Sequence, residues 1–397
     1  MNTPARELHQ TTAPMESYRL DNIRRDLNRN VWCVLGLPFD ATTESATCEH
    51  LLNCIDTRQK CFFTTPNLNF AITASRDQAF RQSVIDSDWV VADGMPLIWV
   101  AKKLGIPLKE RVAGSSVFEA LRQDARRKQR KLRIVFFGGP DGVAAEAFKK
   151  IALEDSAMEV VGFFSPGFGS VEEMSPQHVI DQINESEADM VVVALGAKRG
   201  QAWIEFNRER LNAPILTHLG AVVNFVAGTV ERAPVWMQKS GLEWAWRIWE
   251  ERSLFKRYAK DGLKFLYLYW IWIVPYRKLL NKFSHADKPT PFNFRITVNP
   301  KHQEIHLLGY AVNSQYQHLK PELCKLITSD KHLIIDFAEL IFFDSSFCAT
   351  LLLVAKHRNR NTALRLRNLN TTHVRILRLN GLDYLFNDMS LSNTMLP

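Results

Sequence analysis

The chain has 397 residues, a formal net charge of +8, 46% hydrophobic residues and 23% charged residues. This length is too great for one ordinary hydrophobic core and suits two domains, and the composition excludes a disordered or fibrous protein. The positive charge indicates an acidic partner surface, and phosphate-rich substrates, anionic lipid and nucleic acid all remain open.

The cysteines and the N-terminus bear on the cellular compartment. The six cysteines have irregular spacings, with no close pair of the kind that clamps zinc or performs redox chemistry: Cys33, Cys48, Cys54, Cys61, Cys324 and Cys348. Residues 1–12 are polar and lack the basic start and apolar run of a secretory signal. We therefore expect reduced, mostly buried thiols in a cytoplasmic protein.

Strand-like and helix-like segments alternate in the first half of the chain. The pattern predicts a strand at Val31–Leu37, a helix at Thr43–Arg58 and a strand at Cys61–Thr65. Three more apolar strands run into turns: Trp89–Ala92, Leu132–Phe137 and Met190–Leu195. Because each strand is almost entirely apolar, we expect a largely parallel sheet with helices on both faces, and a ligand beyond the carboxyl ends of the strands.

Polar residues follow two of these strands. Thr65 and Asn67 can hydrogen-bond sugar hydroxyls or phosphate, although this motif taken alone favours a helix cap followed by a turn. Asp93 is a carboxylate at a strand end and can accept the proton of an attacking hydroxyl. An Asp-Gly pair is also a common turn, so position at the strand end is what favours catalysis.

Glycine-rich turns follow the other two strands. Gly138 and Gly139 precede an expected helix at 143–153, whose first N–H groups can bind a diphosphate. The sequence there is neither a dinucleotide-binding fingerprint nor a Walker A loop. Arg199 lies in a second such turn, which either clamps phosphate or is a solvated loop, and Arg232 further along suits a leaving diphosphate.

The composition changes after Gly241, where tryptophans gather among lysines and arginines. Phe265–Val274 is an apolar run of about ten residues, too short for a bilayer span of roughly 20. Tryptophan and tyrosine with flanking basic residues favour a segment at the membrane interface. The alternative is a pair of helices packed on the core.

A polar, proline-bearing linker at 284–291 leads into a second α/β pattern. Strands are expected near Phe294–Val298, Glu304–Leu308 and Leu333–Phe337, and helices near His318–Ile327 and Cys348–Arg358.

The order of the motifs resembles the WecG/TagA/CpsF family of bacterial glycosyltransferases over Val31–Arg257. The motifs that carry the resemblance are Thr65-Pro66-Asn67, Ala92-Asp93-Gly94, Glu110-Arg111-Val112-Ala113-Gly114, Gly138-Gly139, and residues 227–234 leading to Gly241-Leu242-Glu243-Trp244. The resemblance implies a Rossmann-like fold. It also implies inverting transfer of an N-acetylmannosamine-type or related sugar from a UDP donor to a polyprenyl-diphosphate-linked acceptor, without a metal or other cofactor.

The same resemblance implies roles for individual residues. Asp93 matches the proposed general base, Thr65 and Asn67 the lining of its pocket, and the Gly138-Gly139 turn part of the nucleotide site. Further substrate-binding residues are expected at Arg111, Arg199, Gln201, Arg232, Arg252 and Arg257. One departure concerns the sugar donor: where relatives usually carry Gly-x-Pro-Lys-Gln-Glu, this chain places Gly200 at the Gln and Gln201 at the Glu.

In the family, the segment after the Gly-Leu-Glu-Trp motif is a basic appendage that contacts the membrane, a role that falls here to residues 244–282. We therefore expect a peripheral protein on the cytoplasmic face of the inner membrane. The predicted domains are a glycosyltransferase domain at 1–243, an appendage and linker at 244–291, and a third region at 292–397.

Residues 292–397 resemble a STAS domain, the fold of anti-sigma factor antagonists, through Leu333–Phe337, Phe342–Ser346 and Leu379–Leu382. The residue matching Ser345 is often phosphorylated in that family and would switch binding of a protein partner. Phe347 replaces the usual glycine here, and a simple helix cap by Asp344 or Ser345 is the alternative.

Two other functions compete with glycosyl transfer. Gly200 is compatible with a catalytically decayed core that acts as a scaffold through the STAS-like region. Nucleic-acid binding is disfavoured because the cations concentrate beside aromatic residues and no nucleic-acid motif is present.

Overall fold

The computed structural model describes residues 12–139, 150, 157–167, 169–220, 222–223, 233–234, 236–237, 241–252, 254–284, 290–358 and 364–387. The chain divides into two compact units. The central unit comprises Val34–Pro275, and the terminal unit comprises Met1–Cys33 together with Tyr276–Pro397. The expected helix at 143–153 falls almost wholly outside the described residues.

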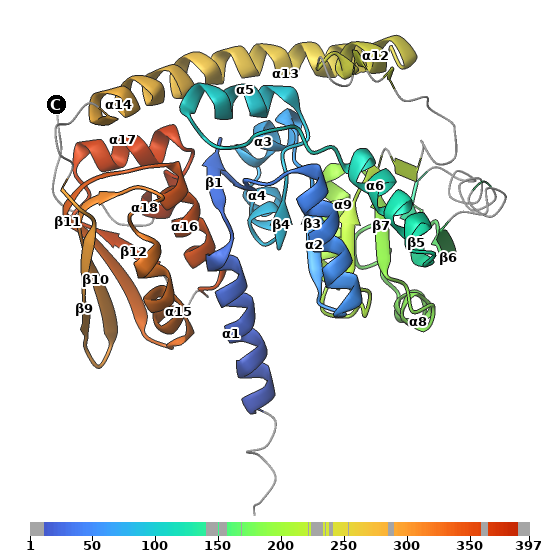
Figure 1. Cartoon of the computed structure of the whole chain (residues 1–397), viewed down its shortest axis with the longest axis horizontal. Helices are drawn as coiled ribbons and strands as arrows, with labels where there is room; N and C mark the ends of the chain where they lie inside the picture. The colour runs from blue at the N-terminus through green and yellow to red at the C-terminus, as the bar shows by residue number, and fades with distance from the viewer. Residues whose placement is uncertain are drawn as a thin grey trace, which may run out of the picture. The chain divides into compact units, whose positions relative to one another are not determined.

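The central unit alternates strands and helices (Figure 1). Its strands are β2 (Leu37–Asp40), β3 (Cys61–Thr64), β4 (Trp89–Val90), β5 (Leu132–Gly138), β6 (Met158–Phe164), β7 (Met190–Ala194) and β8 (Ile215–His218). Its helices are α2 (Glu44–Asp56), α3 (Leu68–Ala74), α4 (Gln78–Ile85), α5 (Met95–Leu104), α6 (Gly114–Arg127), α8 (Gln177–Glu185), α9 (Ala197–Asn207), α12 (Glu243–Glu250), α13 (Leu254–Leu268) and the π-helix η1 (Tyr269–Ile273).

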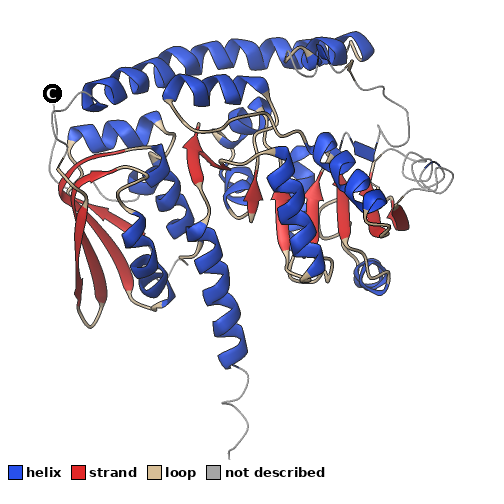
Figure 2. Cartoon of the chain, in the orientation of Figure 1, coloured by secondary structure: helices blue, strands red, loops and turns tan. Residues whose placement is uncertain are grey.

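Six of these strands form one sheet in the order β4-β3-β8-β7-β5-β6, and every neighbouring pair is parallel. Figure 2 shows helices flanking the sheet. Apolar residues of α2 and α6 pack with the strands in one buried cluster, and those of α8 and α9 pack in a second one. Burial on both faces explains why the strand sequences are almost entirely apolar. The mixed α/β architecture with a parallel sheet agrees with the predicted Rossmann-like domain.

Two details of the central unit differ from the sequence prediction. The expected strand at Val31–Leu37 is interrupted after β1 (Val31–Val34), because Leu35 and Gly36 adopt positive φ angles of 52° and 83° and turn the chain. In addition, β6 and β8 complete the sheet, although the sequence did not predict them as strands.

The expected appendage is helical: α12 and α13 precede η1. Several large apolar side chains of α13 and η1 are exposed, which we call the apolar stripe: Phe255, Leu263, Leu266, Tyr267 and Trp270. Leu263, Leu266, Tyr267 and Trp270 follow an i, i+3, i+4, i+7 pattern, and Phe255 lies eight residues before Leu263, so the five side chains fall along one helix face. Within the described residues, no helix combines the length and the hydropathy needed to cross a bilayer.

The terminal unit contains a second sheet, in the order β12-β11-β10-β9. Its strands are β9 (Asn293–Val298), β10 (His302–Ala311), β11 (His332–Phe343) and β12 (Leu364–Arg367), and only the β9–β10 pair is antiparallel. Its helices are α1 (Thr12–Asn28), the 3-10 helix η2 (Gln317–Leu319), α15 (Lys320–Thr328), α16 (Ser345–Lys356), α17 (Thr371–Leu379) and α18 (Tyr384–Asn387), while α14 (Val274–Ser284) contains the boundary between the units.

The division into units differs from the predicted boundaries at 243 and 291. Helix α1 belongs to the terminal unit, because the carboxylate of Asp26 lies 2.8 Å from Lys356 Nζ and 2.7 Å from His357 Nε2 at the end of α16. Helices α12 and α13 belong to the central unit.

Candidate active site

The carboxyl ends of the parallel strands bring the predicted site residues to one edge of the central sheet. Thr64 pairs in register with Val90, and His218 at the end of β8 pairs with Val193. Strand β5, on the other side of β7, ends at Gly138, which pairs with Ala194. The residues that follow these strands therefore share this edge, as expected for an α/β sheet.

Asp93 lies at this edge, half-buried after β4. Burial raises the pKa of its carboxyl from 3.8 to about 6. Arg111, Arg247 and a hydrogen bond from the Gly114 N–H lower this pKa, whereas the nearby Glu243 raises it. Near neutral pH this carboxylate is therefore ionised yet more basic than an ordinary aspartate, which suits a proton acceptor.

Helix α12 is fixed beside Asp93 by an ion pair. Arg111 Nη1 lies 2.5 Å from Glu243 Oε2, and both side chains are largely shielded from solvent. Glu243 is the first residue of α12, so the pair joins the chain before α6 to the start of the appendage. The ion pair therefore holds the start of α12 against Arg111, and both of its charges act on the pKa of Asp93.

The start of α6 packs closely against the residue after β3. A Cβ added at Gly114 would lie 2.3 Å from Leu219 Cδ2 and 3.3 Å from Thr65 Oγ1, so a side chain there would force Leu219 to shift. Asn67 caps α3, where its side-chain oxygen accepts a hydrogen bond of 3.2 Å from the Phe70 N–H. The structure thus brings Thr65 near the Asp93 site and gives Asn67 the capping role considered as its alternative.

The glycine turns lie at the same edge, on the neighbouring strands. Gly138 and Gly139 have φ angles of 86° and 98°, and Gly196 has a φ of 78°, conformations that favour glycine. A Cβ at Gly138 would also lie 2.6 Å from Leu195 Cδ2. Glycine itself carries no side chain that could cover the neighbouring backbone N–H groups, a feature that suits a diphosphate site.

Gly200, which stands where relatives usually carry Gln, packs against His218. A Cβ at this position would lie 2.3 Å from His218 Cδ2, so the imidazole takes the space of a side chain at position 200. Burial lowers the pKa of His218 to about 4, and its Nε2 has no hydrogen-bond partner among the described residues. Gln201 is buried and donates a hydrogen bond from Nε2 to Thr64 Oγ1, which places it beneath the strand ends.

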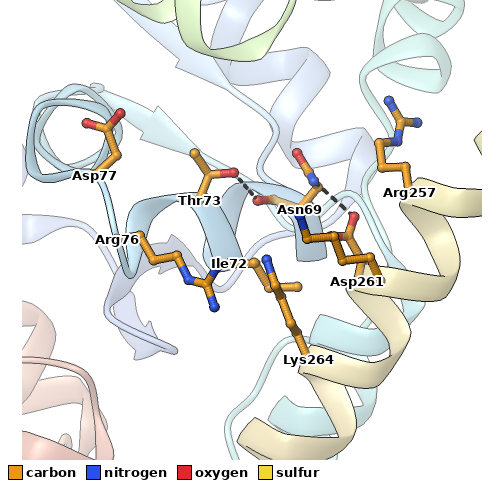
Figure 3. Close-up of a pocket in the computed structure, with 9 residues that line it drawn as sticks. Asn69, Ile72, Thr73, Arg76, Asp77, Arg257, Asp261 and Lys264 are labelled. Atoms are coloured by element: carbon orange, nitrogen blue, oxygen red, sulfur yellow. Dashed lines mark hydrogen bonds between the residues drawn. The ribbon is translucent and has the colours of Figure 1, made fainter.

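The remaining predicted residues are not among the groups that set the pKa of Asp93. Arg199 and Arg252 are exposed, and Arg232 lies outside the described residues. Arg257 lines an open pocket between α3 and α13 (Figure 3), separate from the residues that surround Asp93. Ser345 is 3% exposed at the start of α16, where Asp344 caps the helix.

Sequence reasoning assigned no role to Glu243, Arg247, Gly114 or His218. Glu243 and Gly114 did belong to the quoted motifs, which was a signal that both positions are constrained. His218 carried no such signal, because its contact with Gly200 exists only in the folded chain.

A parallel sheet covered by helices on both faces, with an acid–base group and glycine turns at its carboxyl edge, is typical of α/β enzymes that bind nucleotides.

Comparisons with known proteins narrow this class. Residues 32–279 match the Glycosyl transferase WecG/TagA/CpsF family. Similar proteins from two Bacillus species and from Staphylococcus aureus are named N-acetylglucosaminyldiphosphoundecaprenol N-acetyl-beta-D-mannosaminyltransferase. The Bacillus spizizenii relative is 28% identical over 203 residues, which cover 51% of this chain and 76% of the relative. The Bacillus subtilis relative is 28% identical (53% and 82% covered), and that of Staphylococcus aureus is 23% identical (54% and 82% covered). The chain belongs to the WecG/TagA/CpsF family of glycosyltransferases.

Proposed function

We propose that the chain transfers an N-acetylmannosamine-type or related sugar from a UDP-sugar to a polyprenyl-diphosphate-linked acceptor, with inversion at the anomeric carbon. Family membership and the names of the relatives support this substrate class. The observation that carries the proposal is Asp93, a carboxylate with a pKa of about 6 at the strand edge where α/β proteins bind their ligands.

In the proposed reaction Asp93 accepts the proton of the acceptor hydroxyl as its oxygen attacks the anomeric carbon. The bond between that carbon and the donor phosphate breaks, and the diphosphate leaves with the electron pair. Inversion follows from a single displacement. Thr65 lies near enough to help orient the sugar, because it contacts the start of α6 whose Gly114 N–H also binds Asp93.

The leaving diphosphate gains negative charge as the bond breaks, and preorganised donors stabilise it. The turns at Gly138-Gly139 and Gly196 are the proposed donors on the sheet edge. Arg199, Arg232 and Arg252 are proposed cationic contacts, and none of them needs a metal or other cofactor to act.

The acceptor is proposed to be reached from the membrane surface. The apolar stripe on α13 and η1 is exposed to solvent, and exposed lysines and arginines lie next to it along the helix. Such a helix lies in the plane of an anionic interface. We therefore place the enzyme on the cytoplasmic face of the inner membrane as a peripheral protein.

We further propose that residues 292–397 form a STAS-like domain that binds a protein partner. Three parallel strands and one antiparallel edge strand, with helix α16 following β11, support this assignment. Phosphorylation at Ser345 would first require the start of α16 to open, because this side chain is buried.

The test of sugar transfer is the Asp93→Asn variant, assayed with UDP-N-acetylmannosamine and a polyprenyl-diphosphate-linked N-acetylglucosamine. We expect the rate to fall by about 10²–10⁴-fold, because the amide cannot accept the proton. The matched control is Asp181→Asn, an exposed carboxylate on α8, which should retain the wild-type rate. Equal rates for wild type and Asp93→Asn would rule out Asp93 as the base.

A further inference from the structure

The pocket between α3 and α13 is rich in positive charge. It has a volume of about 280 Å³ and is lined by Asn69, Ile72, Thr73, Arg76, Asp77, Arg257, Lys260, Asp261 and Lys264. The lining thus contains four cations and two carboxylates. In Figure 3, Arg76 from the turn after α3 and Lys264 from α13 extend toward each other.

Both carboxylates of the lining already have partners. Asp77 lies 2.5 Å from Lys198 Nζ, a residue outside the lining, and Asp261 accepts a hydrogen bond of 2.9 Å from Asn69 Nδ2. None of the four lining cations forms an ion pair with another described residue. With four cations and two carboxylates in the lining, and with Asp77 paired to Lys198, the pocket keeps an excess of positive charge.

The cations also repel one another. The pKa of Lys264 is lowered by partial desolvation and by the charges of Arg76 and Lys260, and only Asp261 acts in the opposite direction. A bound anion would remove this repulsion, and a phosphate group accepts several charge-assisted hydrogen bonds from arginine and lysine at once.

The position of the pocket beside the apolar stripe favours the phosphate of a lipid headgroup over a soluble phosphate. Leu263 of the apolar stripe is adjacent in sequence to Lys264 of the pocket, and Leu266 and Tyr267 lie within one helical turn of it. A lipid whose acyl chains contact the stripe would hold its headgroup beside these lysines. A soluble phosphate would make no use of the stripe.

We propose that this pocket binds the phosphate group of an anionic membrane lipid, held between Arg76, Lys260 and Lys264. The site rests on the membrane-surface role proposed above and adds a specific headgroup contact to it. Bound lipid would fix α13 against α3, and with it the segment that leads from the Asp93 site through α12.

The experiment measures association of the full-length protein with vesicles by sedimentation. The vesicles contain phosphatidylcholine with or without phosphatidylglycerol. The pocket variant is Arg76→Gln/Lys264→Gln, and the control is Lys103→Gln/Lys256→Gln, which removes the same charge from exposed residues outside the pocket. We expect the pocket variant to weaken association with phosphatidylglycerol vesicles at least about tenfold more than the control, because only it loses charge-assisted hydrogen bonds.

Two further outcomes decide the proposal. Arg76→Lys/Lys264→Arg keeps both charges and should retain association, whereas equal losses in the pocket and control variants would overturn the site. Calorimetric titration with inorganic phosphate distinguishes the source: binding of free phosphate that depends on Arg76 and Lys264, with unaltered vesicle association, would also overturn a lipid site. Neither measurement involves sugar transfer, so its result is independent of the Asp93 test.

Discussion

Asp93 gives the enzyme a predicted pH dependence. Only the ionised carboxylate can accept a proton, and burial raises its pKa to about 6. As the pH falls through this value the active form is lost, so we expect kcat/KM to decline about tenfold per pH unit below it.

The neighbours of Asp93 should move this acid limb in opposite directions. Glu243 raises the pKa of Asp93, so Glu243→Gln is expected to shift the limb to lower pH. Arg111 lowers it, so Arg111→Gln is expected to shift the limb to higher pH. Profiles of kcat/KM against pH for the three proteins provide the measurement, and a shift of both variants in the same direction would contradict this electrostatic arrangement.

The contact between Gly200 and His218 predicts a strongly coupled pair. Gly200→Gln places a Cβ against the imidazole, and we expect overpacking to cost about 1–3 kcal/mol of stability. His218→Gly in the same chain removes the obstacle, so the double variant should recover much of the loss. Urea unfolding of the two single variants and the double variant measures the coupling, and simple additivity would show that the two positions do not compete for space.

For individual residues, the sequence predicted positions at strand ends, but not the distant side chains that these residues contact. Thr65, Asp93 and the Gly138-Gly139 turn were predictable because an apolar strand that ends in a polar or glycine turn is a local pattern. Glu243 and Arg111 form an ion pair although more than a hundred residues separate them in the sequence, and no local sequence pattern predicts such a contact.

Among the elements, α1 depends on a buried charge cluster in the terminal unit. Burial alone would raise the pKa of Asp26, but Lys356, His357 and Arg29 together hold it well below its usual range. Asp26→Asn leaves these cations without their shared carboxylate, and we expect a loss of about 3–5 kcal/mol. The measurement is the denaturant midpoint of the terminal unit, followed by proteolysis of α1.

The same helix supplies the control for Asp26. Asp21 pairs with Arg24 at 3.5 Å, and both side chains are more than 60% exposed. Asp21→Asn should therefore change stability by less than about 1 kcal/mol. Because the folded-state pKa of Asp26 is lowered, its contribution persists at neutral pH and is lost only as the pH falls below about 4 toward that lowered value. A wild-type protein and an Asp26→Asn variant with equal midpoints at pH 7 would contradict the role of the cluster.

Elements with continuous apolar runs were predictable, since β3, β5 and β7 lie near their expected positions. The strand β8 was not, because Thr217 and His218 interrupt its apolar pattern at the carboxyl end. The break between β1 and β2 depends on a positive φ at Leu35, a conformation that leucine rarely adopts and that its sequence does not predict.

On the scale of the whole molecule, segments from opposite ends of the chain belong to the same unit, so the order of segments along the chain does not give the units. The terminal unit takes one helix from the start of the chain and its sheet from the end. The sequence indicated two α/β patterns, but only long-range contacts such as those of Asp26 show where α1 belongs.

The apolar stripe and the basic residues beside it predict salt-sensitive membrane association of the intact protein. Electrostatic attraction to phosphatidylglycerol vesicles should weaken as added salt shortens the screening length, while burial of the stripe supplies the apolar part. Leu263→Glu/Trp270→Glu is expected to reduce association at low salt at least about tenfold, because two carboxylates replace apolar side chains that the membrane would bury.

The control for the stripe is Val298→Glu/Ile341→Glu, which places the same two charges on exposed apolar positions of the terminal unit. If general charge repulsion were the cause, both double variants would lose association equally. If the stripe is the contact, only the first variant detaches, and its far-ultraviolet circular dichroism and unfolding midpoint match those of the wild type. Failure of the wild-type protein to sediment with the vesicles at low salt would exclude the interfacial helix altogether.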